Sequence, residues 1–119
     1  MDGNLKKELM EAGINVDEAI ERMMGYEDFF IQLLKKFAFD NTYEQLRQAL
    51  KEGNPSNAFK AAHTLKGLSG DLSIDVLFLP LTEITDALRD DHIDQANIYM
   101  QEFSQLYDKV VSRISSIVG

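Results

Sequence analysis

The chain has 119 residues, long enough to bury a core in one domain (residues 1–119) and too short for two. Its net charge of −8 argues against nucleic acid as a partner, because phosphate contacts need clustered Lys and Arg, and the absence of cysteine excludes disulfides, thiolate metal sites and thiol catalysis. No apolar run approaches the roughly 20 residues of a membrane span, and the first residues carry no apolar signal-peptide core. We therefore expect a cytoplasmic protein without membrane contact, and we expect it to be a monomer.

The beginning of the chain predicts two short helices. Residues 5–12 can form the first, which ends at Gly13. The second begins at Asn15 with the spacing of a capping box, because Glu18 follows the capping residue by three positions. It would end at Gly25. The residues of this helix expected to face inward are Val16, Ala19, Ile20 and Met23.

A strongly amphipathic helix is predicted over residues 26–39, and a further helix follows it and ends at Gly53. Asn41 and Thr42 interrupt the pattern between the two, although a single kinked helix also fits the spacing. The apolar positions are Phe29, Phe30, Leu33, Leu34 and Phe37 in the first helix and Tyr43, Leu46 and Leu50 in the second.

The helix predicted over residues 54–73 is the one around which the chain is organised. Asn54 offers a side-chain oxygen as a cap, and Pro55 suits the first helical position. Small and apolar residues then recur at spacings of four and three, which predicts one buried stripe. The stripe consists of Ala58, Ala62, Leu65, Ser69 and Leu72, widened on one side by Ala61 and Leu68.

His63 lies about 140° from the middle of that stripe, counting about 100° per residue, so its imidazole is expected to be exposed. Its neighbours one and two helical turns away are Phe59, Lys66, Gly67 and Gly70. A glycine inside a helix costs about 1 kcal/mol relative to alanine, and core packing does not explain one on the solvent side. Either another macromolecule comes close to His63, or a surface helix simply tolerates glycine.

Two lysines, Lys60 and Lys66, flank His63 along the same helix. In an acidic chain they would make the local field at the histidine less negative than over the average surface. The alternative is that the two lysines have no special role, because lysines are common on exposed helical faces.

The last third of the chain predicts two more helices. Leu77, Leu81, Ile84 and Leu88 keep helical spacing, but Pro80 conflicts with a helix that starts at Val76. Either the regular helix begins near Leu79 or it is bent there. A polar turn over residues 89–92 follows, with Asp90 or Asp91 as the cap of a final helix over 92–117. The inward face of that helix consists of Ala96, Tyr99, Phe103, Leu106, Val110, Ile114 and Ile117.

Short connections between these helices favour antiparallel neighbours. The predicted fold is all-α: an antiparallel up-down four-helix bundle with additional short helices at its N-terminal end. His92, the second histidine, lacks a following Lys-Gly pair and is interpreted as a solvated turn residue. A metal site would need His92 and the outward-pointing His63 to meet with carboxylates, so we expect no metal and no cofactor.

The sequence His63-Thr64-Leu65-Lys66-Gly67, with Gly70 following, resembles the H-x-L-K-G-x-x-G core of histidine-containing phosphotransfer (HPt) domains. The stretch over residues 13–37 also resembles the two helices that open bacterial members, so the resemblance covers nearly the whole chain. One residue departs from the pattern. The family often has glycine three residues beyond Gly70, where this chain has Ser73, near the expected helix end.

The resemblance implies a helical bundle that carries a phosphoryl group on His63 between the aspartates of response-regulator receiver domains, with a hybrid histidine kinase as a further partner. The metal ion and the acceptor aspartate would belong to the receiver. A neutral imidazole is a suitable nucleophile, and Lys66, one turn away, can offset the charge that builds on the phosphoryl oxygens. The residues expected to contact the partner are Phe59, Lys60, Gly67 and Gly70. The chain would be a carrier without turnover of its own, because it has no glycine-rich nucleotide loop and no Walker sequence.

Two other functions fit the same residues. One is a helical interaction module that binds a partner through the face from Phe59 to Gly70 without chemistry. The other is the phospho-accepting domain of a chemotaxis-type histidine kinase, expressed alone.

Overall fold

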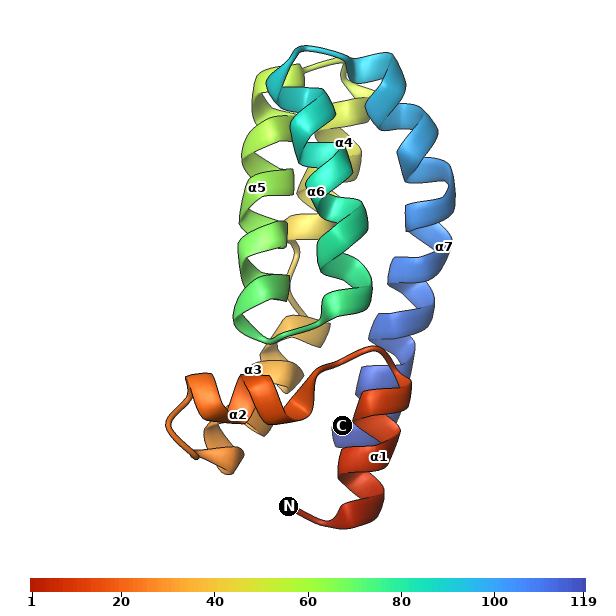
Figure 1. Cartoon of the computed structure of the whole chain (residues 1–119). Coiled ribbons are helices and arrows are strands. Elements are labelled where there is room, and N and C mark those ends of the chain that lie inside the picture. The colour runs from red at the N-terminus through yellow and green to blue at the C-terminus, as the bar shows by residue number, and fades with distance from the viewer.

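The computed structural model describes residues 1–119, and every regular element of the chain is an α-helix (Figure 1). The prediction of an all-α fold is therefore confirmed. The seven helices are, in chain order, α1 (Gly3–Glu11), α2 (Val16–Arg22), α3 (Glu27–Ala38), α4 (Thr42–Lys51), α5 (Pro55–Asp71), α6 (Asp75–Arg89) and α7 (Ile93–Val118). None of these helices combines the length and apolar character that crossing a membrane requires.

Helices α4, α5 and α6 lie beside the first part of α7, while α1, α2 and α3 gather around the other end of the molecule (Figure 1). Helix α5 packs against α4 and α6, and α7 packs against α6 and α3. The short α1 contacts the C-terminal part of α7 (Figure 1). One core of 27 buried apolar residues draws side chains from all seven helices.

Two helix starts follow the capping chemistry predicted from the sequence. Asn54 Oδ1 accepts a hydrogen bond from the backbone N–H of Asn57 at 3.0 Å, and Pro55 occupies the first position of α5. Asn15 Oδ1 accepts from the N–H of Glu18 at 3.2 Å. The Glu18 carboxylate accepts from the Asn15 side-chain amide at 3.1 Å. The backbone N–H of Asn15 donates instead to the carbonyl of Ser73, so only half of a capping box forms.

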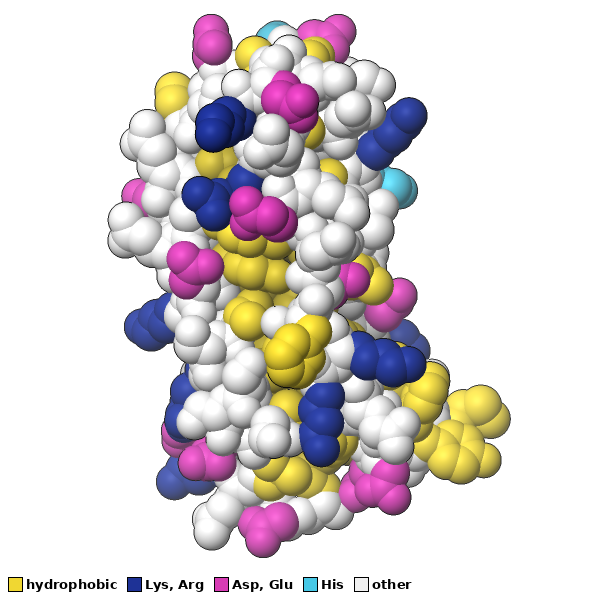
Figure 2. All heavy atoms as spheres, turned by 180° about the vertical axis from the view of Figure 1, so that it is seen from behind, with side chains coloured by type: hydrophobic (Ala, Val, Ile, Leu, Met, Phe, Trp, Pro, Cys, Tyr) yellow, Lys and Arg dark blue, Asp and Glu magenta, His cyan; other side chains and the backbone are white.

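The region between residues 26 and 53 forms two separate helices, so the interruption near Asn41 is confirmed and the single kinked helix is wrong. Phe29 was expected to face inward, but it is 54% exposed, whereas Phe30 is fully buried. With Met24 and Tyr26, Phe29 forms an exposed apolar surface at the α2–α3 connection. Figure 2 shows hydrophobic side chains projecting at this end of the molecule. Helix α3 thus buries a narrower stripe than its composition predicted.

Helix α6 begins at Asp75 and contains Pro80, so a start near Leu79 is wrong. The proline removes one backbone hydrogen bond, a cost of about 3 kcal/mol. Helix α6 buries Leu77 before the proline and Leu81 after it, and this burial on both sides offsets the cost.

Helix α7 is not capped by Asp90 or Asp91. Asp91 adopts φ +58 in the turn, and the helix begins after His92, whose side chain makes no capping hydrogen bond. The backbone N–H of His92 donates to the carbonyl of Ala87 at 2.8 Å, which closes the turn at the end of α6.

The turn that ends α5 is held by an arginine from α2. Ser73 adopts φ +52, a left-handed conformation that favours glycine, and it is 1% exposed. The Arg22 guanidinium donates to the carbonyls of Gly70 and Asp71 and to Ser73 Oγ. This contact uses the Ser73 hydroxyl, so the serine provides a hydrogen-bond partner that glycine would lack.

Candidate functional site

Helix α5 is oriented by its small residues, as its spacing predicted. Its side chains at Ala58, Ala62, Leu65 and Ser69 are fully buried, and Leu72 is 4% exposed. Small alanines let α4 and α6 approach closely on either side, and these two helices make the most extensive contacts of α5. The opposite face of α5 is therefore left to solvent.

His63 is exposed on that face. Its imidazole stacks on the ring of Phe59, one turn earlier in the same helix, with 5.8 Å between ring centroids and 16° between ring planes. Phe59 is half-buried and packs against the core. The histidine is thus accessible to a partner while one side of its ring is supported.

The two lysines predicted to matter lie on either side of His63. Lys60 is exposed, and Lys66 places its Nζ 5.5 Å from the ring centroid of Phe78, on α6. Neither lysine takes part in an ion pair, so no carboxylate of this chain neutralises them. Around His63 the chain therefore presents positive charge, against its net charge of −8.

The two glycines of the motif differ from one another. A Cβ built on Gly67 would meet no atom within 4 Å, so open space lies over this residue, as predicted. A Cβ on Gly70 would lie 3.0 Å from Phe78 Cε2 and 3.2 Å from Cδ2. The prediction that Gly70 faces solvent without a neighbour is wrong, because Phe78 of α6 packs on this glycine. Gly70 therefore allows the ring beneath Lys66 to sit close to α5.

Arg89 is a residue at this site that the sequence did not single out. It is the last residue of α6, and its Cζ lies 5.6 Å from the centroid of Phe59. Arg89 Nη1 also pairs with the Asp86 carboxylate at 2.7 Å. Arg89 follows His63 by 26 positions, and no helical periodicity links residues on two different helices, so only the packing of α5 on α6 brings them together.

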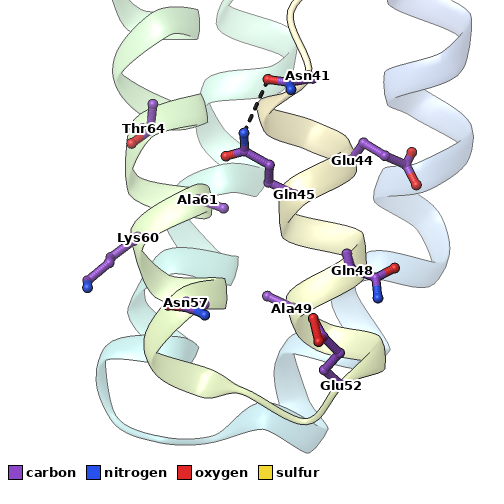
Figure 3. Close-up of a pocket in the computed structure, with 10 residues that line it drawn as sticks. All are labelled: Asn41, Glu44, Gln45, Gln48, Ala49, Glu52, Asn57, Lys60, Ala61 and Thr64. Atoms are coloured by element: carbon purple, nitrogen blue, oxygen red, sulfur yellow. Dashed lines mark hydrogen bonds between the residues drawn. The ribbon is translucent and has the colours of Figure 1, made fainter.

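A groove runs between α4 and α5 beside the histidine face (Figure 3). Its volume is about 590 Å³, and buried alanines from both helices, Ala49 and Ala61, contribute to its lining. Polar side chains line the rest, most of them amides and carboxylates, and the Gln45 amide donates to Asn41 at 3.2 Å. Lys60 lies at its rim and points outward in Figure 3. The groove is open and polar, and no two of its lining residues form an ion pair with each other.

No group of three or more histidine, aspartate or glutamate side chains is placed to hold a metal ion. His92 lies at the start of α7, exposed, in the turn that follows α6.

The model of the Hpt domain family matches residues 38–113, more than half of the chain. The chain belongs to the Hpt domain family. The matched region of this Hpt protein contains α4, α5 and α6, with the whole His63 motif, and most of α7. Helices α1 and α2 lie outside it, as does all of α3 except its last residue, Ala38. No curated protein and no solved structure matches the chain.

Membership places the protein in two-component signalling. Hpt domains are phosphocarrier modules rather than conventional enzymes, and they interact with receiver domains and histidine kinases. For this Hpt protein, the family confirms the resemblance noted in the sequence. Family membership alone does not identify the residue that carries the phosphoryl group.

Proposed function

We propose that this Hpt protein is a phosphorelay shuttle that passes a phosphoryl group between receiver-domain aspartates through His63. The observation that carries the proposal is an exposed histidine on the open face of α5, within the region that the Hpt family model matches. Its motif glycine Gly67 leaves open space beside it. A receiver has to bring its aspartate close to the imidazole, and a bare stretch of helix permits that approach.

The transfer step involves one bond formed and one bond broken. A ring nitrogen of His63 donates its electron pair to the phosphorus of a phosphoaspartate, and the bond from phosphorus to the aspartate oxygen breaks. That electron pair stays on the aspartate carboxylate. The proton on the second ring nitrogen remains there or passes to water. The reverse step, on another receiver, returns the phosphoryl group to an aspartate and frees the imidazole.

Lys66 is proposed to stabilise the charge on the phosphoryl oxygens, and Phe59, Lys60, Gly67 and Gly70 are proposed to form the contact surface. Lys66 is suited to this role because it forms no ion pair and lies one turn from His63. The role of Gly70 changes in the light of its packing. Gly70 would contribute to docking indirectly, because the absence of a side chain lets Phe78 pack close to α5, beneath the Lys66 ammonium group.

The frame of the site, we propose, is an antiparallel up-down four-helix bundle of α4, α5, α6 and α7, with α1, α2 and α3 as additional helices at its N-terminal end, forming one domain over residues 1–119 (Figure 1). The contacts of α5 with α4 and α6, and of α7 with α6 and α3, support this arrangement. The shared core of all seven helices supports a single domain. A monomeric state, a cytoplasmic location and the absence of nucleic-acid and membrane partners remain predictions from the sequence.

The test is phosphotransfer from a phosphorylated receiver domain, with detection of acid-labile, base-stable phosphate on the Hpt protein. Wild-type protein should take up phosphate and His63→Gln should not, with an unchanged melting temperature because the side chain is exposed. His92→Gln is the matched control and should transfer normally. Uptake by His63→Gln and not by His92→Gln would show that the wrong histidine was named.

The same assay separates the alternatives. Stable binding of a receiver without any phosphate uptake would indicate an interaction module. Phosphate uptake from a kinase domain encoded beside this gene, with none from receivers, would indicate the phospho-accepting domain of a chemotaxis-type kinase.

A further inference from the structure

A contact between α6 and α5 connects Arg89 to the histidine through one aromatic ring. The Arg89 Cζ lies 5.6 Å from the centroid of Phe59, and the same ring stacks on His63 with an interplanar angle of 16°. Phe59 therefore contacts a cation from one helix and the imidazole of another residue on its own helix.

The guanidinium of Arg89 also pairs with a carboxylate of its own helix. Its Nη1 lies 2.7 Å from Asp86 Oδ1, one turn earlier in α6. A planar guanidinium stacks well on an aromatic face, and an ion pair at one edge restricts how far it swings away. Asp86, Arg89 and Phe59 thus form a connected series that ends at the imidazole.

The rate of phosphoryl transfer depends on how the imidazole is oriented. An exposed histidine rotates about two side-chain bonds, and only some orientations aim a ring nitrogen at the phosphorus of a partner's aspartate. Holding a reacting group close to its productive orientation lowers the barrier, and a misplacement of about 1 Å costs up to about 100-fold in rate. A ring that stacks on an imidazole favours some of these orientations over others, and a cation over that ring favours one placement of the ring.

We propose that Arg89 is a positioning residue for phosphoryl transfer, which fixes the Phe59 ring and through it the plane of the His63 imidazole. The inference rests on the proposed function and adds to it a residue outside the helix that bears the motif. It differs from the role of Lys66, whose ammonium group sits over Phe78 and not over the ring that supports the histidine.

The experiment uses the full chain and a phosphorylated receiver domain over a range of concentrations. Arg89→Ala should lower the maximal transfer rate by about tenfold while leaving the receiver concentration at half-maximal rate within about twofold. Arg89→Lys should retain part of the rate, because it keeps the cation without the planar group. The matched control is Arg47→Ala, because Arg47 also pairs with a nearby carboxylate, Glu44, and lies over an aromatic ring, Tyr43, on α4.

Two further measurements show whether Arg89 acts through Phe59. In unphosphorylated protein, the carbon-bound ring protons of His63 should shift in Arg89→Ala toward their positions in Phe59→Leu, and stay in place in Arg47→Ala. The double variant Arg89→Ala/Phe59→Leu should transfer about as slowly as Phe59→Leu alone, since both changes remove the same support. Thermal unfolding of each variant confirms that it is folded.

The outcomes are distinguishable. Wild-type protein that takes up no phosphate overturns the proposed function and this inference with it. Normal wild-type transfer that Arg89→Ala leaves unchanged overturns this inference alone. Two other results would also overturn this inference alone, because Arg89 would then not act through the ring. In the first, the double variant transfers about tenfold more slowly than Phe59→Leu. In the second, Arg89→Ala leaves the His63 resonances unshifted.

Discussion

Gly67 and Gly70 are the residues at which the surface of α5 can be tested most directly. Replacing Gly67 by alanine should raise the free energy of unfolding by about 0.5–1 kcal/mol, because alanine is the better helix former and its Cβ meets open space. Gly70→Ala should gain less or lose stability, because its Cβ would press on Phe78 at 3.0 Å. Urea unfolding of the two variants side by side measures the difference.

A larger residue at position 67 tests whether this glycine is needed for packing or for the approach of a partner. Gly67→Tyr should fold normally and lose most of its phosphotransfer, because its side chain would stand where, in the proposed function, the receiver approaches His63. An unfolded Gly67→Tyr protein would show that the glycine is needed for packing. A folded variant with normal transfer would show that the partner does not pass over this residue.

At the scale of the element, the C-terminal end of α5 is held by Arg22, about 10 Å or two helical turns from His63. Arg22→Ala should lower the free energy of unfolding by about 1–2 kcal/mol, because charged hydrogen bonds to two carbonyls and to Ser73 Oγ are lost from a partly exposed site. Urea unfolding provides the measurement. Arg113→Ala is the control, since its ion pair with Glu8 spans 4.0 Å and its loss should cost little.

A loss of stability for Arg22→Ala no larger than for Arg113→Ala would contradict this assignment. If the loss is larger, the left-handed conformation of Ser73 can be tested by adding Ser73→Gly to the Arg22→Ala variant. Ser73→Gly relieves the backbone conformation but removes an Arg22 partner, so it should help more when Arg22 is already alanine.

The elements themselves were largely predictable, because they depend on local chemistry. The caps at Asn15 and Asn54 and the buried stripe of α5 follow from residue type and spacing alone. The start of α6 did not follow, because local propensity penalises Pro80 while the burial of residues around it depends on tertiary packing. The exposure of Phe29 has the same cause: whether a helix face is covered depends on the helices that reach it.

In the candidate site, too, the sequence predicts features of a single helix but not the contacts between helices. The exposure of His63 and the open space over Gly67 could be derived from one helix. The packing of Phe78 on Gly70 and of Arg89 on Phe59 could not, since each contact joins α5 to α6. Where a contact joins two helices, the spacing of residues within one helix does not predict it.

The core itself offers a prediction for the whole molecule, at the stacked rings of Tyr43 and Tyr107, which join α4 to α7 with 3.9 Å between centroids. Burial, with the nearby negative charge of Asp40, raises the pKa of Tyr107 from 10.0 to about 12. The folded protein therefore holds this phenol proton at pH values where the unfolded chain has released it. The stability contributed is complete below pH 10 and is lost as the pH rises through about 12.

Between pH 9 and pH 11.5 the free energy of unfolding should thus fall more steeply in wild-type protein than in Tyr107→Phe, which keeps the other three tyrosines and lacks only the phenol at position 107. Urea unfolding across this range measures both slopes, and taking their difference removes the contribution of the ionisable groups that both proteins share. Tyr26→Phe, at a residue that is 67% exposed, serves as the control and should keep the wild-type slope. Parallel slopes for wild type and Tyr107→Phe would mean that water reaches the Tyr107 hydroxyl, and that α4 and α7 are less tightly joined than their stacked rings indicate.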